Sequence, residues 1–332
     1  MVRAAWLYHV GGFNQEETAA QLGLTRARVN RLLSEAREQG LVTISVDHEL
    51  VGMLPVEDRI REHFGLDFCR ATPAFGLGAA PAAGEAFSEA RSRISIRAVG
   101  LASANFLRAK LAAMDAPTIG VGWGRTIEQM GLQLGSVRAR KARFISLMGS
   151  LTANSSSNPF EVVQALARRT GAEGYVLPVP FIADTVADKE VFLSQRPVSR
   201  ALAIARSASL CMISVGELTE AALLRRQGML SRNDLESLRA AGAVGDTNGI
   251  FFDNSGRPVD HELNSRTLAV PFETLRELPV VLMVGGIEKI AAAAALLQSG
   301  IVNGLIIDGD TALALGDRIA AAEDRLPNDP RS

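Results

Sequence analysis

Apolar residues follow two different patterns along the chain. In about the first fifty residues they recur at spacings of three and four, which is typical of short amphipathic helices. From about residue 90 onward, short continuous apolar runs alternate with amphipathic segments. Continuous apolar strands separated by helices indicate a parallel sheet that is covered on both faces. The pattern therefore predicts a small helical unit followed by a larger α/β domain.

The larger region reads as a series of strands and helices. The predicted strands are 117–123, 142–149, 174–180, 209–216, 278–286 and 304–309. The predicted helices are 56–64, 90–113, 126–134, 159–170, 198–206, 287–299 and 311–322. Residues 73–85 are rich in Gly, Ala and Pro and predict a surface loop. We expect a doubly wound, mostly parallel, Rossmann-like sheet.

The first fifty residues fit a helix-turn-helix. Ala19 supplies the small residue where the two helices cross, and Gly23 supplies a turn residue that tolerates positive φ. Asn14 and Thr25 are suited to cap the two helices. The apolar residues expected between the helices are Leu22, Leu24, Val29 and Leu32.

Flanking segments complete this unit. Val2–Val10 predicts a packing helix whose apolar face holds Ala5, Trp6 and Val10. After Gly40, the run LVTISV predicts a short strand.

Charge favours DNA binding by the second helix of this pair. The whole chain has a formal net charge of −1, so any contact with DNA must come from a local patch. Between Leu24 and Ser34 there are three arginines and no acidic residue. A solvated arginine face on an ordinary helical subdomain is the alternative. We assign Thr25, Arg26, Asn30 and Arg31 to the major groove and Arg28 to a phosphate.

Length and pattern set the domain boundaries. A chain of 332 residues is long enough for about two domains. Periodicity weakens between Val46 and Val56, so we expect a helix-turn-helix domain over 1–50 and an effector domain over 56–322. Residues 323–332 form a tail.

Composition narrows the class of protein. The two cysteines and four histidines lack the spacing of a disulfide framework or a metal site, and we expect no metal and no cofactor. No apolar run reaches the roughly 18 residues that span a bilayer, and the start of the chain lacks a signal-peptide pattern. We expect a cytoplasmic protein without a membrane partner.

One strand-to-helix loop has the residues of an anion site. The predicted strand passes Val121 and runs into Gly122, Trp123, Gly124, Arg125 and Thr126, which lead into a helix. Glycines permit close backbone approach, and a helix N-terminus offers free N–H groups to a phosphate. A plain tight turn is the alternative, because GxG before a helix is common. The loop is neither a Walker loop nor a full dinucleotide motif.

Three further loops carry polar candidates. Ser150 and Asn154 lie in a loop that either contacts ligand hydroxyls or is only surface. Asp246 and Asn248 lie among glycines, where the carboxylate either accepts sugar hydroxyls or organises a turn. Lys289 follows a buried strand and two glycines, and it either reaches an anionic ligand or is solvated.

With these motifs in order, the chain resembles the SorC family of sugar-catabolism regulators along nearly its whole length. The resemblance rests on the helix-turn-helix, GVGWGRT, LPVPFIAD, GAVGDTNGIFFDNSGRPVD, VGGIEKI and LIIDGDTA. The chain departs from the family at Ile307, Asp308 and Gly309, where family members often read TDE.

The resemblance implies function and partners. It implies an effector domain related in fold to sugar-phosphate isomerases and deaminases. The effector would be a phosphorylated sugar or polyol, and a homo-oligomer, a tetramer or dimer, would act on operator DNA, commonly as a repressor. The phosphate would rest on Gly122–Thr126, and Asp246 and Lys289 would hold the opposite end of the effector.

An enzyme is the rival interpretation. A sugar-phosphate isomerase or deaminase with an accessory DNA-binding module needs a positioned general base. Asp246 could serve, but no histidine lies beside it in the sequence. We therefore expect no catalytic residues.

Overall fold

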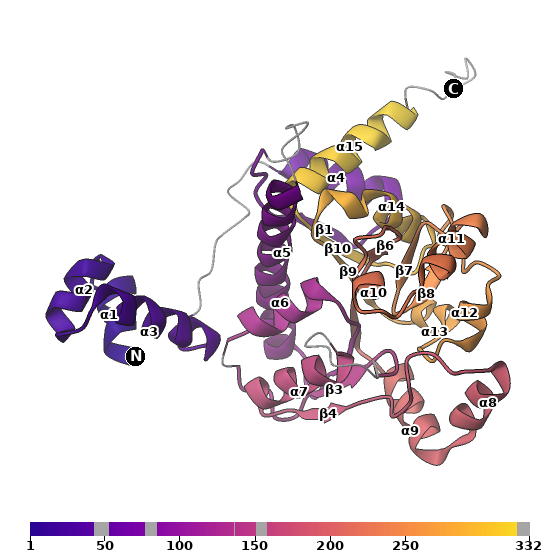
Figure 1. The fold of residues 1–332 in the computed structure, drawn as a ribbon, viewed down its shortest axis with the longest axis horizontal. Helices are drawn as coiled ribbons and strands as arrows, with labels where there is room; N and C mark the ends of the chain where they lie inside the picture. The colour runs from indigo at the N-terminus through magenta and orange to yellow at the C-terminus, as the bar shows by residue number, and fades with distance from the viewer. Residues whose placement is uncertain (43–52, 77–84, 136, 151–157, 324–332) are drawn as a thin grey trace.

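A computed structural model describes residues 1–42, 53–76, 85–135, 137–150 and 158–323 (Figure 1). The predicted strand after Gly40 therefore falls mostly outside the described residues, as do most of the loop predicted at 73–85 and nearly all of the tail. None of the helices in the described ranges is long and apolar enough to cross a bilayer.

The N-terminal unit consists of three helices. They are α1 (Val2–His9), α2 (Gln15–Leu22) and α3 (Arg26–Glu38). Asn14 caps α2 in a capping box with Glu17, Gly23 ends it with a φ of 63°, and the Thr25 hydroxyl accepts the Arg28 N–H. These local features match the sequence prediction because each depends on residues only a few positions apart.

The core of this unit differs from the predicted one. Val29 is fully buried, and Leu22 and Leu32 are partly buried as expected, but Leu24 is 38% exposed. The rest of the core comes from small residues and from the next turn of α3, namely Ala4, Ala5, Ala19, Leu33 and Ala36. The prediction that Leu24 lies in the core was wrong, because the turn after Gly23 points its side chain outward.

The predicted apolar face of α1 was also partly wrong. Ala5 is buried, but Trp6 and Val10 are 62% and 66% exposed. The buried side of α1 holds two alanines, Ala4 and Ala5, because α3 approaches too closely for larger side chains.

The larger domain is built on a seven-stranded sheet that is wholly parallel. Its order is β1-β10-β9-β5-β2-β3-β4. The strands are β1 (Phe68–Ala71), β2 (Thr118–Val121), β3 (Arg143–Ser146), β4 (Glu173–Tyr175), β5 (Leu210–Ser214), β9 (Val280–Val284) and β10 (Gly304–Ile307). Every residue of β9 is buried, as the continuous apolar run predicts. The predicted strand at 174–180 is shorter than expected, and β1 was not predicted.

Helices cover both faces of this sheet (Figure 1). One core cluster joins the sheet to α5 (Glu85–Ala113), α6 (Arg125–Gln133) and α7 (Pro159–Thr170). The other joins it to α4 (Leu54–Phe64), α9 (Arg196–Arg206), α14 (Ile290–Gln298) and α15 (Gly309–Glu323). Successive residues of β3 point to opposite faces of the sheet: Phe144 lies in the cluster with α5, α6 and α7, and Ile145 lies in the other cluster. The doubly wound prediction is confirmed.

A small antiparallel sheet was not predicted. It contains β6 (Gly216–Glu217), β7 (Gly245–Thr247) and β8 (Ile250–Phe252). Between β6 and β7 the chain forms α10 (Leu223–Arg226) and α11 (Arg232–Ala240), and after β8 it forms α12 (Glu262–Arg266) and α13 (Phe272–Arg276). The helix α8 (Val186–Ser194) packs against α9 and α12. Strands of two or three residues are too short to show a period in the sequence.

The strand order reverses between β2 and β5. From β2 the chain passes to β3 and β4 on one side and then returns to β5 on the other side of β2. Loops that leave two adjacent strands in opposite directions open a crevice at their carboxyl ends. This crevice positions the site described next.

Candidate functional site

The crevice contains a pocket whose charged residues come from distant parts of the chain. Arg125 opens α6 after β2, Glu217 lies on β6 after β5, Asp246 lies on β7, and Lys289 ends a 3₁₀ turn, η2 (Ile287–Lys289), after β9. The pocket is small, about 30 Å³, which is room for about one water molecule. The structure thus brings together two cations and two carboxylates at the switch point.

Backbone contacts hold the glycine loop close to the neighbouring strand. The Gly122 N–H donates to the Met212 carbonyl at 2.9 Å, and the Ser214 hydroxyl donates to the Trp123 carbonyl at 2.7 Å. A Cβ at Gly122 would lie 2.7 Å from Oδ1 of Asn248, so a larger residue there would displace the Asn248 side chain. Gly124 caps α6 with a φ of 113°, which favours glycine. These contacts fix the glycine loop against β5.

Most of the charged side chains of the pocket are deeply buried. Asp246 is 4% exposed and Lys289 is 5% exposed, so the alternative of a solvated Lys289 is wrong. One oxygen of Asp246 accepts the Gly249 N–H at 3.2 Å, and Arg125 lies 3.9 Å from Glu217. Buried charges that are only loosely paired are costly to the fold, which points to a role other than stability.

Burial shifts the pKa values in this pocket. Loss of solvent raises the pKa of Asp246 to about 7; the Gly249 N–H and Lys289 oppose the rise, and Glu217 adds to it. Burial also lowers the pKa of Lys289, against the attraction of Glu217. Perturbed titratable groups in a crevice are typical of a functional site.

Two neighbouring polar side chains lack partners. Thr126 and Asn248 are 0% and 1% exposed, and neither the Thr126 hydroxyl nor the Asn248 amide has a hydrogen-bond partner in the structure. Asn248 also has a φ of 50°, which is uncommon outside glycine. Unpaired buried polar groups and local strain both gather at binding sites.

Among the predicted effector residues that the structure describes, Ser150 lies away from this pocket. Ser150 lies beside Pro180 in a different hollow, where its hydroxyl is hydrogen-bonded to Asn158. Asn154 lies outside the described residues. Glu217 was missed by the sequence analysis, because a carboxylate on a two-residue strand carries no local signal.

The pH dependence of stability tests the burial of Asp246. Its folded-state pKa lies above the ordinary 3.8, so the folded chain retains a proton that the unfolded chain releases. The stabilising contribution is complete below about pH 4 and is lost as the pH rises through about 7. Asp246→Asn removes this loss. We measure the free energy of unfolding in urea for both proteins. The value for Asp246→Asn minus the value for wild type should increase by about 2 kcal/mol between pH 5 and pH 8.

Asp317→Asn, at an exposed carboxylate of α15, is the matched control and should show no such growth. If the difference in free energy of unfolding between Asp246→Asn and wild type does not change with pH, Asp246 is not a buried acid with a raised pKa.

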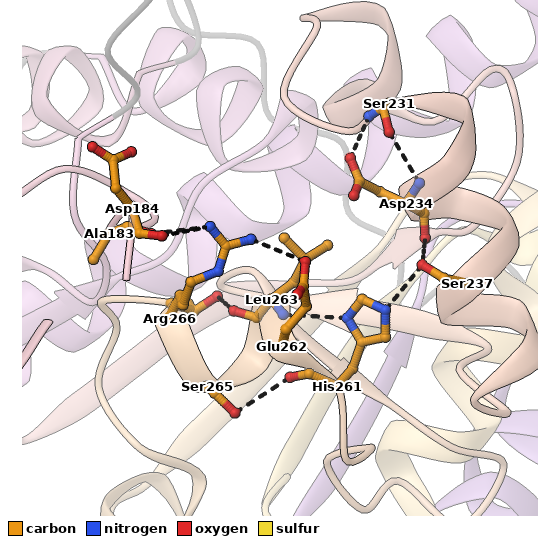
Figure 2. A network of polar contacts seen from close by, with 11 residues as sticks. Ala183, Asp184, Ser231, Asp234, Ser237, His261, Glu262, Leu263, Ser265 and Arg266 are labelled. Carbon is orange, nitrogen blue, oxygen red and sulfur yellow. Dashed lines mark hydrogen bonds and ion pairs between the residues drawn. The ribbon is translucent and has the colours of Figure 1, made fainter. Parts of the chain in front are cut away.

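His261 is bound into the fold rather than poised for proton transfer (Figure 2). Its Nδ1 accepts the Leu263 N–H at 3.2 Å, so Nε2 carries the proton and donates to the Ser237 hydroxyl at 3.0 Å. That hydroxyl in turn donates to the Asp234 carbonyl. The arrangement caps α12 and joins it to α11, and it leaves His261 no free nitrogen to act as a general base.

Three arginines in the N-terminal half of α3 are exposed. Arg26, Arg28 and Arg31 lie on the surface, and none of them forms an ion pair with a carboxylate that the structure describes. Thr25 and Asn30 are also exposed. The positive edge that the sequence predicts is therefore open to a ligand.

Gln15 links two of these residues and was missed by the sequence analysis. Its side-chain oxygen accepts from Arg26 Nε, and its amide nitrogen donates to Asn30 Oδ1, both at 3.4 Å. Gln15 opens α2 just after its Asn14 cap, and the crossing of the helices brings it to the N-terminal end of α3. It is placed to orient two side chains that the sequence analysis assigns to the major groove.

Gln15→Ala should weaken specific DNA binding without unfolding the unit. Two long hydrogen bonds are lost, and we expect affinity in a gel-shift titration to fall about three- to tenfold. Gln21→Ala, at an exposed glutamine in the last turn of α2, is the control. An unchanged affinity for Gln15→Ala would exclude this orienting role.

Comparisons with known proteins agree over most of the chain. The family described as "Putative sugar-binding domain" matches residues 48–315. The chain is 35% identical over 314 residues to the erythritol catabolism regulatory protein EryD of Brucella abortus (strain 2308), covering 95% of each protein. It is 27% identical over 319 residues to the transcriptional regulator LsrR of Escherichia coli (strain K12), covering 95% of this chain and 93% of LsrR.

A solved structure shows the same fold. The full-length sorbitol operon regulator SorC from Klebsiella pneumoniae superposes with a TM-score of 0.67 at 22% identity, covering 95% of this chain and 97% of that one. These similar proteins are transcriptional regulators rather than enzymes.

Proposed function

The chain belongs to the SorC family of sugar-binding transcriptional regulators, and from this premise we propose that it controls a sugar or polyol catabolic operon in response to a phosphorylated effector. The carrying observation is the pocket at the switch point, where Arg125, Asp246 and Lys289 meet with little exposure to solvent. Their chemistry suits a small ligand that bears both hydroxyls and an anionic group.

The N-terminal unit is the DNA reader. We assign residues 1–50 to DNA binding, residues 56–322 to the effector domain and residues 323–332 to a tail. Thr25, Arg26, Asn30 and Arg31 read bases in the major groove, and Arg28 contacts a phosphate. Support comes from the exposure of all five side chains on one end of α3.

The effector phosphate lies at the start of α6. The N–H groups of the first turn, the Arg125 guanidinium and the Lys289 amine surround the space after Gly122–Gly124. The hydroxyls of the effector bind the carboxylates of Asp246 and Glu217. Thr126 and Asn248 supply further donors and acceptors, which accounts for their lack of partners.

The small size of the pocket indicates that effector binding changes the conformation of the protein. At about 30 Å³ the pocket is too small for a sugar phosphate, so binding requires a second, more open arrangement of its walls. An effector that binds one of two arrangements more tightly shifts the population toward it. The protein acts as a homo-oligomer, a dimer or tetramer in the cytoplasm, because paired recognition helices are needed to span two half-sites. Repression relieved by the effector is the mode we propose.

A thermal-shift screen tests the effector assignment. Sugars and polyols, each with and without a phosphate and with erythritol among them, are compared at equal concentration. A ligand that binds the folded form raises the melting temperature, and the same compound must change operator affinity in a gel shift. If phosphorylated compounds give no shift where their unphosphorylated forms do, the phosphate assignment fails.

A further inference from the structure

Arg125 also lines a second hollow, outside the pocket. A groove of about 500 Å³ runs between α5 and α6, and its polar lining residues include Arg93, Arg97, Arg125, Glu128 and Gln129. The groove is far larger than the pocket, which holds about 30 Å³. Since one guanidinium borders both spaces, a ligand bound in the pocket can extend past Arg125 into the groove.

The groove and the pocket share a wall. Gly285 precedes the turn that carries Lys289, and a Cβ at Gly285 would lie 2.9 Å from the Cα of Ile96 on α5. Beside this contact the Ser92 hydroxyl donates to the Glu288 carboxylate at 2.9 Å. The N-terminal half of α5 is therefore packed directly on the turn that positions Lys289.

The charged side chains along the groove are mostly positive, whereas positive and negative side chains are equal in number in the pocket. In the pocket, Arg125 and Lys289 face Glu217 and Asp246, two cations against two carboxylates. Among the side chains that the structure describes along the groove, three arginines face one carboxylate, that of Glu128. The net positive charge near the effector site thus lies in the groove.

The charges of Arg93 and Arg97 are not paired with any other residue that the structure describes. Both are exposed, and their guanidinium groups make no hydrogen bond or ion pair with another residue of the described chain. They lie four residues apart on one face of α5, where like charges repel each other. An anionic ligand would relieve this repulsion, and a pair of guanidinium groups suits a carboxylate or phosphate.

We propose that the groove binds a second anionic group of the effector, a carboxylate or a phosphate, through Arg93 and Arg97. This inference rests on the proposed function, because it needs the first anionic group to lie at Arg125 and Lys289. It specifies the effector class as a sugar or polyol derivative that is negatively charged at both ends.

Matched pairs of ligands test the proposal. Aldonate phosphates and alditol phosphates of four, five and six carbons differ only in a terminal carboxylate in place of an alcohol. By isothermal titration calorimetry, we expect wild type to bind the aldonate phosphate about tenfold more tightly at one chain length at least. Arg93→Gln/Arg97→Gln should close this gap and leave the affinity for the alditol phosphate unchanged.

The control is Lys110→Gln, which removes an exposed charge about 20 Å farther along α5. It should keep the tenfold preference. The second site is excluded if wild type binds the two ligand types equally at every chain length. It is also excluded if the double variant keeps the preference for the aldonate phosphate. Either result would leave the proposed function intact. If no phosphorylated compound binds, the proposed effector class itself fails, and the second site fails with it.

Discussion

Arg26→Ala/Arg31→Ala is expected to reduce specific DNA affinity about 100-fold or more. A good base contact in the major groove contributes roughly 1–3 kcal/mol, and the double variant removes two of them. Both side chains are exposed and unpaired with carboxylates that the structure describes, so their removal leaves no buried group behind. The measurement is a gel-shift titration against a duplex that wild type has selected from a random pool.

Arg37→Ala is the control that distinguishes the loss of base contacts from the loss of positive charge on α3. Arg37 is exposed in the last turn of the same helix, about 16 Å from Arg26 along its axis. Its loss should change affinity by less than about threefold. If Arg37→Ala is as damaging as the double variant, α3 binds DNA by charge alone and the assignment of its N-terminal end to the groove is wrong.

Lys289→Met is expected to abolish the response to effector while DNA binding is retained. A buried cation that contacts an anionic ligand contributes 2–5 kcal/mol, so effector affinity should fall about 100-fold or more. Methionine is apolar and similar in length to lysine, and Arg125 remains 3.9 Å from Glu217, so the carboxylates of the pocket keep one cation. Calorimetry with the effector from the thermal-shift screen gives the affinity, and a gel shift gives the operator response.

Lys141→Met is the matched control. Lys141 pairs with Asp115 at 2.9 Å on the surface, where both side chains are largely exposed. Its loss should leave both effector affinity and operator release as in wild type. Normal effector-dependent release in Lys289→Met would exclude Lys289 from the site, whatever its burial.

The two sites differ in how far sequence could predict them. The exposed arginines of α3 were predictable, because a helix cap, a turn glycine and a run of eleven residues without an acid are all local signals. The glycine loop before α6 was predictable for the same reason. In contrast, Glu217 on β6 and the Gln15 contact to Arg26 and Asn30 arise only when separate elements meet.

Sequence by itself determined the longer elements and the α/β class. Caps at Asn14 and Thr25, continuous apolar strands such as β9, and glycines at strand ends act over a few residues, and the α/β alternation follows from them. Only the tertiary structure decided which strands are neighbours, and so which loops share the crevice between β2 and β5. Burial is likewise a property of the assembled layers: it leaves Leu24 and Trp6 exposed, encloses Lys289, and raises the pKa of Asp246. No local pattern carries that information, because it depends on residues far apart in the chain.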